Sequence, residues 1–507
     1  MKKVEIHKNS YYDSVKLMAV NKAVSSLQGV RQAAVFMGTP HNRELLKEAG
    51  LDLPETHEAG PADLIIALEV EGESAWKEAQ KCIEEELSPR VASPGTYRPR
   101  TLEGAIKQMP GANLALISLP GDYAAAEAHL ALDRGLHVML FSDNVSLEEE
   151  ITLKEKARGQ GLLLMGPDCG TALIGGAPLG FANNLKAGPV GIVAAAGTGA
   201  QEVSTLLHQR GIGVSHILGT GGRDLQDEVG GITMLQGIAA LENDPATEIL
   251  VLISKPPGKE TEKKLEAEIK KNRKPVITVF LGSEIPDLSG GAQTLEEGAN
   301  KVIQLLNEEK GSLSREDREE ELAEEILIEL PPLNSEQRYL RGLFTGGTLC
   351  YEALLILNDW LQPLYSNTPL EPGQKLENPR ESQAHTCVDL GEDLFTRGRA
   401  HPMIDPEIRL ERINQEVQRG DMAVLLLDLV LGYGAHEDPA GSLAPVLEEA
   451  QKKTREKGGH LRVVTSICGT AEDPQDYEQQ KKKLEQVGAV VAPSNAAAVR
   501  MAARLCP

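Results

Sequence analysis

The stretch GPVGIVAAAGTGAQEV, residues 188–203, combines a short apolar run, a Gly-Thr turn and the start of a helical pattern. A second stretch, RYLRGLFTGGTLCYEA, repeats this design at residues 338–353. A strand that enters a helix through such a turn leaves backbone N–H groups pointing outward at the helix N-terminus. These donors and the helix dipole favour an anion such as phosphate or carboxylate. The two stretches therefore predict an α/β fold with two anion-binding turns.

Thr198 and Thr348 hold matching places in the two turns, where each could cap its helix or donate its hydroxyl to an anion. Neither turn has the GxxxxGK[ST] pattern of a P-loop, so a structural helix cap is the alternative interpretation. Glycine lacks a Cβ and lets an oxyanion approach the main chain. The glycines concerned are Gly197 and Gly199 in the first turn (197–199), and Gly346 and Gly347 in the second turn (346–348).

Further segments repeat in the same order after each turn. GGRDL (221–225) matches LGEDL (390–394), and the apolar run of LISKPPG (252–258) matches LLDLVLG (426–432). The second copy is longer, and residues 361–382 are its insertion. The pattern indicates an internal duplication that gives two flavodoxin-like domains.

The whole chain alternates short β-rich runs with helical patterns, which is typical of α/β domains. Near-continuous apolar strands predict parallel sheets, whose ligands lie beyond the carboxyl ends of the strands. We expect a small ferredoxin-like α/β domain at 1–94, a Rossmann-type domain at 95–187, a flavodoxin-like domain at 188–308, a charged linker at 309–335 and a second flavodoxin-like domain at 336–507.

Composition excludes several classes of function. The 507 residues carry a net charge of −23, which disfavours nucleic acid and membrane surfaces as partners. No run is long and apolar enough for a transmembrane helix, and the N-terminal residues do not form a secretory signal. The six cysteines have no metal-ligand spacing, so we expect reduced thiols, no metal and a cytoplasmic protein.

Three segments hold the remaining candidate side chains. Arg223 could bind a phosphate or carboxylate, although a surface ion pair with Asp224 is equally compatible with the sequence. Cys169, in GPDCG (166–170), is either a nucleophile or, as the better interpretation, a buried or ligand-lining cysteine. The segment 390–406 clusters polar residues in a predicted loop, a pattern typical of functional sites: Asp393, Arg397, Arg399, His401 and Asp405.

These motifs carry a family resemblance. GPDCG, the first turn, LGTGGRDL (218–225) and the ENDP of 242–245 resemble, in this order, the α subunit of succinyl-CoA synthetase and other NDP-forming acyl-CoA synthetases. The whole chain resembles the FdrA branch of that superfamily, and the match covers residues 95–507.

The resemblance implies a CoA-binding-type Rossmann domain followed by two ligase-CoA-type domains. It also implies cofactor- or phosphate-binding roles for the two turns and for five further residues: Asp168, Cys169, Gly222, Asp224 and Asp393. Asp168 stands where the synthetases have Asn. The loop SEIPDLSGGAQTLEEGAN (283–300) contains no histidine, whereas the synthetases carry a phosphohistidine there, and no ATP-grasp domain is recognisable in the chain.

The FdrA branch is associated with ureide and allantoin catabolism and with oxamate carbamoyltransferase complexes. The resemblance therefore implies a transferase subunit that uses carbamoyl phosphate or an acyl phosphate and works with partner subunits, although a homodimer is also compatible. Arg223, Arg397, Arg399 and His401 are the expected catalytic residues, and CoA, phosphate and carbamoyl phosphate are the candidate ligands. The alternatives are an NDP-forming acyl-CoA synthetase and a non-enzymatic scaffold that senses CoA or a nucleotide.

Overall fold

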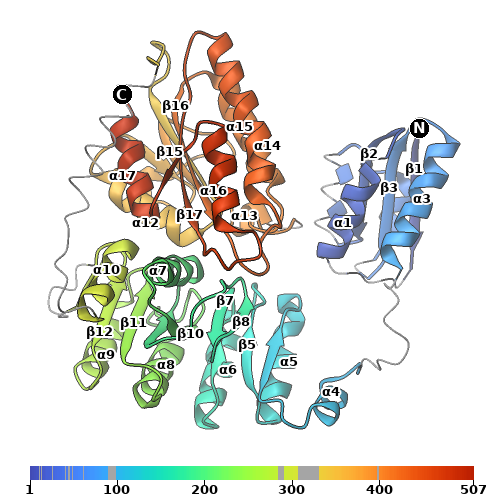
Figure 1. Ribbon diagram of the computed structural model, residues 1–507. Coiled ribbons are helices and arrows are strands. Elements are labelled where there is room, and N and C mark those ends of the chain that lie inside the picture. Colours follow the sequence, from blue (N-terminus) through green and yellow to red (C-terminus); the bar gives the residue numbers. More distant parts are fainter. Residues whose placement is uncertain are drawn as a thin grey trace. The chain divides into compact units, whose positions relative to one another are not determined.

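A computed structural model of the chain describes residues 1–88, 99–283, 290–306, 331–396 and 399–507, apart from the single positions 9, 11, 13, 26, 40, 41, 44, 45, 48 and 61 (Figure 1). The chain divides into two compact units. One consists of Met1–Ala105 with Asp393–His401, and the other of Ile106–Glu392 with Pro402–Pro507. The predicted linker at 309–335 lies mostly outside the described residues.

The N-terminal unit contains a three-stranded antiparallel sheet in the order β1-β3-β2. Apolar side chains of α1 and α3 pack on one face of this sheet, among them Leu17, Val20 and Ile83. The elements are β1 (Lys2–His7), α1 (Ser14–Ser25), β2 (Val30–Met37), η1 (Pro54–Glu58), β3 (Leu64–Val70) and α3 (Glu73–Leu87). The short helices α4 (Leu102–Gln108) and α13 (Asp393–Thr396) occur at two of the three chain crossings between the units.

The larger unit begins with three parallel strands in simple chain order, β4-β5-β6. They are β4 (Leu114–Ile117), β5 (His137–Leu140) and β6 (Leu164–Met165), joined through α5 (Gly121–Asp133) and α6 (Leu147–Gly159). The hairpin of β7 (Thr171–Ile174) and β8 (Ala177–Gly180) then leaves this sheet and pairs antiparallel with β10 of the next one. Strand pairing therefore crosses the boundary that the sequence predicts between residues 187 and 188.

The next sheet, called the central sheet here, has the order β12-β11-β9-β10-β7-β8. Its parallel part reproduces the predicted alternation of buried strands and helices. The elements are β9 (Val190–Ala194), α7 (Gly197–Gln209), β10 (Val214–Gly219), α8 (Ile232–Asn243), β11 (Ile249–Ser254), α9 (Lys259–Ile269), β12 (Val276–Phe280) and α10 (Leu295–Leu306).

The C-terminal sheet is parallel throughout, in the order β14-β15-β13-β16-β17-β18. Its order β15-β13-β16-β17 parallels the order β10-β9-β11-β12 of the central sheet, and in both the first strand in the chain leads to a Gly-Thr turn. The elements are β13 (Tyr339–Phe344), α12 (Gly347–Asn358), β14 (Leu364–Ser366), η2 (Pro372–Gln374), β15 (His385–Asp389), α14 (Glu407–Arg419), β16 (Met422–Val430), α15 (Pro439–Glu456), β17 (Arg462–Cys468), α16 (Tyr477–Gln486), β18 (Val490–Ala492) and α17 (Asn495–Leu505).

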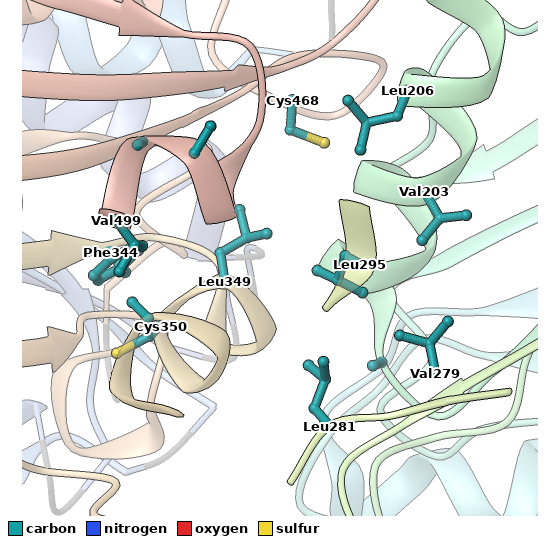
Figure 2. Close-up of a cluster of buried hydrophobic side chains, with 14 of the residues drawn as sticks. Val203, Leu206, Val279, Leu281, Leu295, Phe344, Leu349, Cys350, Cys468 and Val499 are labelled. Atoms are coloured by element: carbon teal, nitrogen blue, oxygen red, sulfur yellow. The ribbon is translucent and has the colours of Figure 1, made fainter. Parts of the chain in front are cut away.

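One apolar core joins these two sheets. Helices α7 and α10 contribute Val203 and Leu295, and they face Leu349 of α12 and Val499 of α17 across the junction (Figure 2). All four side chains are fully buried. Because burial of such side chains contributes roughly 1.5–3 kcal/mol each, the two sheets form one cooperative body.

Two buried glutamates interlock the same helices. Glu202 of α7 accepts a hydrogen bond from the backbone N–H of Asn495, the first residue of α17, at 2.8 Å. Glu352, at the matching place in α12, accepts one from the backbone N–H of Leu295, the first residue of α10, at 2.7 Å. The Asn495 amide also donates to Glu352 at 2.7 Å. Each glutamate thus caps a helix of the other sheet.

Burial raises the pKa of Glu202 and of Glu352 to about 7, while the Asn495 and Leu295 donors act in the opposite direction. A carboxyl group whose pKa is higher in the folded than in the unfolded state contributes stability that is complete below its unfolded pKa and is lost as the pH rises through the folded value. The junction should therefore become less stable between about pH 4.5 and 7.

We expect the double substitution of Glu202→Gln and Glu352→Gln to reduce this pH dependence, because an amide keeps an acceptor oxygen but does not ionise. The melting temperature of the wild type, followed by circular dichroism, should fall more between pH 5 and 8 than that of the variant. The difference corresponds to on the order of 1–3 kcal/mol in the free energy of unfolding. Parallel curves for the two proteins would contradict this account of the junction.

Candidate functional site

The two predicted turns lie against each other. A Cβ placed on Gly346 would lie 3.0 Å from Cγ2 of Thr198, and a Cβ placed on Gly199 would lie 3.0 Å from Cγ2 of Thr348. Each threonine thus packs on a glycine of the opposite turn. The N-termini of α7 and α12 meet at this contact. Thr198 and Thr348 therefore lie close together although they are 150 residues apart in the sequence.

The first turn is open to an anion. No side chain caps α7, whose N-cap residue is Ala196. Thr198 is only 9% exposed, and among the described residues its hydroxyl has no hydrogen-bond partner. Three N–H groups and a hydroxyl therefore stand at the positive end of the α7 dipole without a protein acceptor.

The second turn differs because the protein already supplies a carboxylate there. The fully buried Asp428 of β16 accepts hydrogen bonds from the backbone N–H of Thr345 at 2.8 Å and of Gly346 at 2.7 Å. Its Oδ1 also pairs with Arg409 of α14 at 3.0 Å. Asp428 thus occupies the Gly346 donor of the predicted turn, while α12, like α7, has no side-chain cap among the described residues.

A second carboxylate stands beside the second turn. Asp389, the last residue of β15, is 4% exposed, and its Oδ2 lies 2.5 Å from the position that a Cβ on Gly347 would take. Its Oδ1 accepts a hydrogen bond from the backbone N–H of Gly391 at 2.9 Å. Burial raises the pKa of Asp389 to about 7, and Glu392 adds to this rise.

Strand register explains why the two turns differ. Val193 of β9 pairs with Leu252 and Leu218, and Leu343 of β13 pairs with Leu427 and Val388. On the strands beside β9, the residues that follow these paired positions are Ile253 and Gly219, next to the first turn. On the strands beside β13 they are Asp428 and Asp389, next to the second turn. The first turn thus has apolar or small neighbours where the second has two acids.

The GPDCG segment packs against the segment that follows β10. A Cβ on Gly219 would lie 2.4 Å from Sγ of Cys169, and a Cβ on Gly221 would lie 2.2 Å from the carbonyl oxygen of Pro167. Asp168 adopts a left-handed φ of 56° and lies next to Gly222. Gly197 of the first turn contacts Thr171. The structure therefore brings three predicted segments to one edge of the central sheet.

Cys169 suits the buried alternative and not the nucleophile. It is 2% exposed, and burial raises the pKa of its thiol to about 12. The reactive thiolate is therefore not formed near neutral pH.

Arg223 and Asp224 do not form the surface pair that the sequence allowed. Asp224 is fully buried, binds Lys154 Nζ at 2.7 Å and accepts hydrogen bonds from the backbone N–H groups of Thr233 and Met234 at the start of α8. Arg223 binds Glu150 at 2.9 Å and is 40% exposed. The surface ion pair does not form because Asp224 is buried. A buried carboxylate requires a buried cation, which is Lys154 here.

The polar segment after β15 is divided between the two compact units, and its residue Asp405 lies in the larger one. Asp393, Arg399 and His401 lie within Asp393–His401, which is grouped with Met1–Ala105. Arg397 lies outside the described residues. Burial lowers the pKa of His401 to about 4, so this histidine is neutral at physiological pH.

Sequence reasoning missed Asp428, Asp389 and Lys255, which follows β11. The signal for Asp428 was a carboxylate inside the apolar run MAVLLLDLV. Asp389 is the last residue of the buried strand β15, and Lys255 directly follows the buried strand β11. Ligand-binding residues of parallel sheets occupy such positions at the carboxyl ends of strands.

Comparisons with known proteins identify two matching families and several similar proteins. Residues 343–505 match a family described as CoA-ligase, and residues 1–99 match one described as AllF, heavy metal-associated domain. The α subunit of ADP-forming succinate–CoA ligase from Aquifex aeolicus is 31% identical over 192 residues, which cover 37% of this chain and 61% of that protein. The acetyl-coenzyme A synthetase 1 of Ca. Korarchaeum cryptofilum, in its apo form, has 15% identity and a TM-score of 0.29, covering 78% of this chain and 82% of that one.

Part of the chain is therefore similar to the α subunit of succinate–CoA ligase, and residues 343–505 match the CoA-ligase family. The chain is 42% identical to the uncharacterized protein YahF of Escherichia coli over 97% of its own length and 96% of that protein. It belongs to the family of YahF, which is FdrA-like.

The described residues do not fit a soft heavy-metal ion, although the N-terminal family is described as heavy metal-associated. Among them, no three His, Cys, Asp or Glu side chains are grouped as metal ligands. The one cysteine of residues 1–99 is Cys82 on α3, and burial raises its pKa. Soft metal ions prefer thiolate and thioether ligands, and a raised pKa disfavours the thiolate of Cys82. None of the described helices could span a membrane.

We expect Gly219→Ala to destabilise the protein by about 1–3 kcal/mol, because its methyl group would overlap Cys169 and the backbone oxygen of Thr171. Gly159→Ala is the matched control, since a Cβ there has nothing within 4 Å. Thermal unfolding measured for both variants gives the comparison. Equal melting temperatures would show that the GPDCG segment does not pack on the end of β10.

Proposed function

We propose that this chain is a phosphate-binding subunit that transfers an acyl or carbamoyl group from a mixed anhydride with phosphate to an acceptor. In this step the acceptor attacks the carbonyl carbon and loses a proton. The bond between that carbon and the bridging oxygen breaks, and phosphate leaves with the electron pair. The first turn would hold the phosphate and stabilise the charge that develops on it.

The observation that carries this proposal is the difference between the two turns. Among the described residues, neither α7 nor α12 has a side-chain cap, but Asp428 and Asp389 stand at the second turn, whereas no carboxylate takes the corresponding place at the first. Like charges repel in a site of low dielectric, so an anion would bind at the first turn. We therefore propose one phosphate-binding site, at the first turn, where the sequence predicted two.

Strand order and the similar proteins support two further parts of the proposal, an internal duplication and partner subunits. The shared order of four strands in the two sheets supports an internal duplication, and the relatives named as ligase subunits support a hetero-oligomer with partner subunits. CoA is the acceptor that the relatives' names suggest. We also propose a cytoplasmic location, because the cysteines that the structure describes are free thiols.

An NDP-forming acyl-CoA synthetase is the second candidate, favoured by the relatives. That mechanism passes phosphate from ATP through a histidine, yet residues 283–300 contain none. Incubation with γ-labelled ATP separates the two functions. Covalent labelling of the chain would favour the synthetase and count against the proposed transferase.

We expect Thr198→Val to weaken phosphate binding about three- to tenfold, because valine keeps the packing methyl on Gly346 and removes the hydroxyl donor. Thr348→Val is the matched control: it makes the same change at the turn next to Asp428 and should bind phosphate like the wild type. The rise in melting temperature with inorganic phosphate, acetyl phosphate and carbamoyl phosphate measures the binding.

Equal losses in the two variants, or no stabilisation of the wild type by any of the three compounds, would contradict the proposed site. Stabilisation by CoA alone, without turnover of either anhydride, would favour the scaffold that senses CoA.

A further inference from the structure

Lys255 brings a positive charge to the junction of the two turns. It follows the last residue of β11, the strand beside β9, so it lies at the carboxyl edge next to the first turn. Its Nζ is 5.1 Å from the ring centre of Tyr351, which belongs to α12. Lys255 therefore reaches from the central sheet to the helix that starts at the second turn, and it is exposed.

Asp389 approaches the junction from the C-terminal sheet. Of its two carboxylate oxygens, Oδ1 is bonded to the Gly391 N–H, while Oδ2 accepts no hydrogen bond from the described residues and points at the first residue of α12. The side chain is more than nine-tenths buried. This oxygen is not among the fully enclosed atoms without a partner, so it is accessible to a donor or a proton from outside the protein.

The two side chains act on the same place. The charges of both Asp389 and Lys255 influence the thiol of Cys350, and Lys255 directly opposes the rise in the pKa of Asp389. Asp389 touches Gly347, whose neighbour Gly346 touches Thr198. Gly347 and Gly346 thus connect the free oxygen of Asp389 to Thr198 of the first turn.

Other charged and titratable groups around Asp389 come from each packed element. Burial is the largest cause of the raised pKa of Asp389. Glu392 on its own loop and Asp428 on β16 also raise this pKa, and Lys255, which follows β11, lowers it. Asp428 is itself paired with Arg409 of α14. The remaining groups are the buried thiols of Cys350 on α12 and Cys387 on β15, which burial keeps protonated.

We propose that Lys255 and Asp389 complete the anion site at the first turn, and that a phosphate-type dianion binds there together with one proton taken up by Asp389. This inference rests on the anion site proposed above. Lys255 supplies the counter-charge. Protonated Asp389 removes a repulsion and can donate its O–H to an oxygen of the bound anion or return the proton to a leaving group.

The coupling has a definite sign. An anion next to a carboxyl group disfavours ionisation and raises its pKa, so binding takes up a proton and affinity increases as the pH falls. One linked proton changes affinity by at most about tenfold for each pH unit. Because Asp389 already has a pKa of about 7, this dependence falls between about pH 6 and 8.5.

Isothermal titration calorimetry with sodium sulfate tests the proposal on the intact chain. Sulfate resembles a phosphate dianion but does not titrate in this range, and runs in buffers of different ionisation enthalpy report the protons taken up. We expect the wild type to bind sulfate with uptake approaching one proton and to lose affinity as the pH rises from 6.5 to 8.5. This measurement does not depend on any variant folding.

Asp389→Asn should bind sulfate without proton uptake and, at pH 8.5, more tightly than the wild type. Lys255→Gln should bind at least about fivefold more weakly at every pH, because one charge-assisted contact is lost, and should keep the proton uptake. Asp359→Asn is the charge-matched control, since Asp359 is exposed at the other end of α12 and should leave binding unchanged.

Two results separate this inference from the function on which it rests. Sulfate binding that is independent of pH in the wild type, or that keeps its proton uptake in Asp389→Asn, overturns the role of Asp389 and leaves the anion site. An absence of sulfate binding at every pH overturns the site at the first turn and the inference with it.

Discussion

The contact between the N-termini of α7 and α12 is the constraint on which the larger unit depends. Each threonine faces a glycine of the other turn, where a Cβ would lie only 3.0 Å from the threonine methyl group, so the close approach of the two helix ends favours glycine at both places. The exchange of caps through Glu202 and Glu352 then fixes α10 and α17 around the same junction. Both sheets contribute to one close-packed core around the two turns, and this packing holds the turns in place.

Two helix dipoles that meet with their positive ends together require negative charge nearby. The structure provides it on one side only: Asp428 and Asp389 stand at α12, while the neighbours of α7 are Ile253 and Gly219. Such an arrangement makes the junction electrostatically uneven. No carboxylate of the described residues balances the positive end of α7, and this is the basis for the phosphate site proposed there. Lys255 lies at the same carboxyl edge of the central sheet.

The residues of the two turns and the order of the segments around them could be predicted from the sequence, since each strand, turn and helix has its own local pattern. The roles of Asp224 and Cys169 could not, because they depend on burial. Asp224 meets Lys154, seventy residues earlier in the chain, and Cys169 lies beneath Gly219. The hairpin of β7 and β8 was missed because four-residue strands carry little periodic signal.

The sequence by itself determined the α/β class, the two Gly-Thr turns and the absence of a histidine from residues 283–300, because these are properties of local pattern and composition. Only the tertiary structure decided that the two turns touch and that they are unequal. That difference arises from strand register: the residue one place beyond each paired position is Ile253 or Gly219 in one sheet and Asp428 or Asp389 in the other. Register is set by the pairing of strands far apart in the chain, so no local pattern can reveal it.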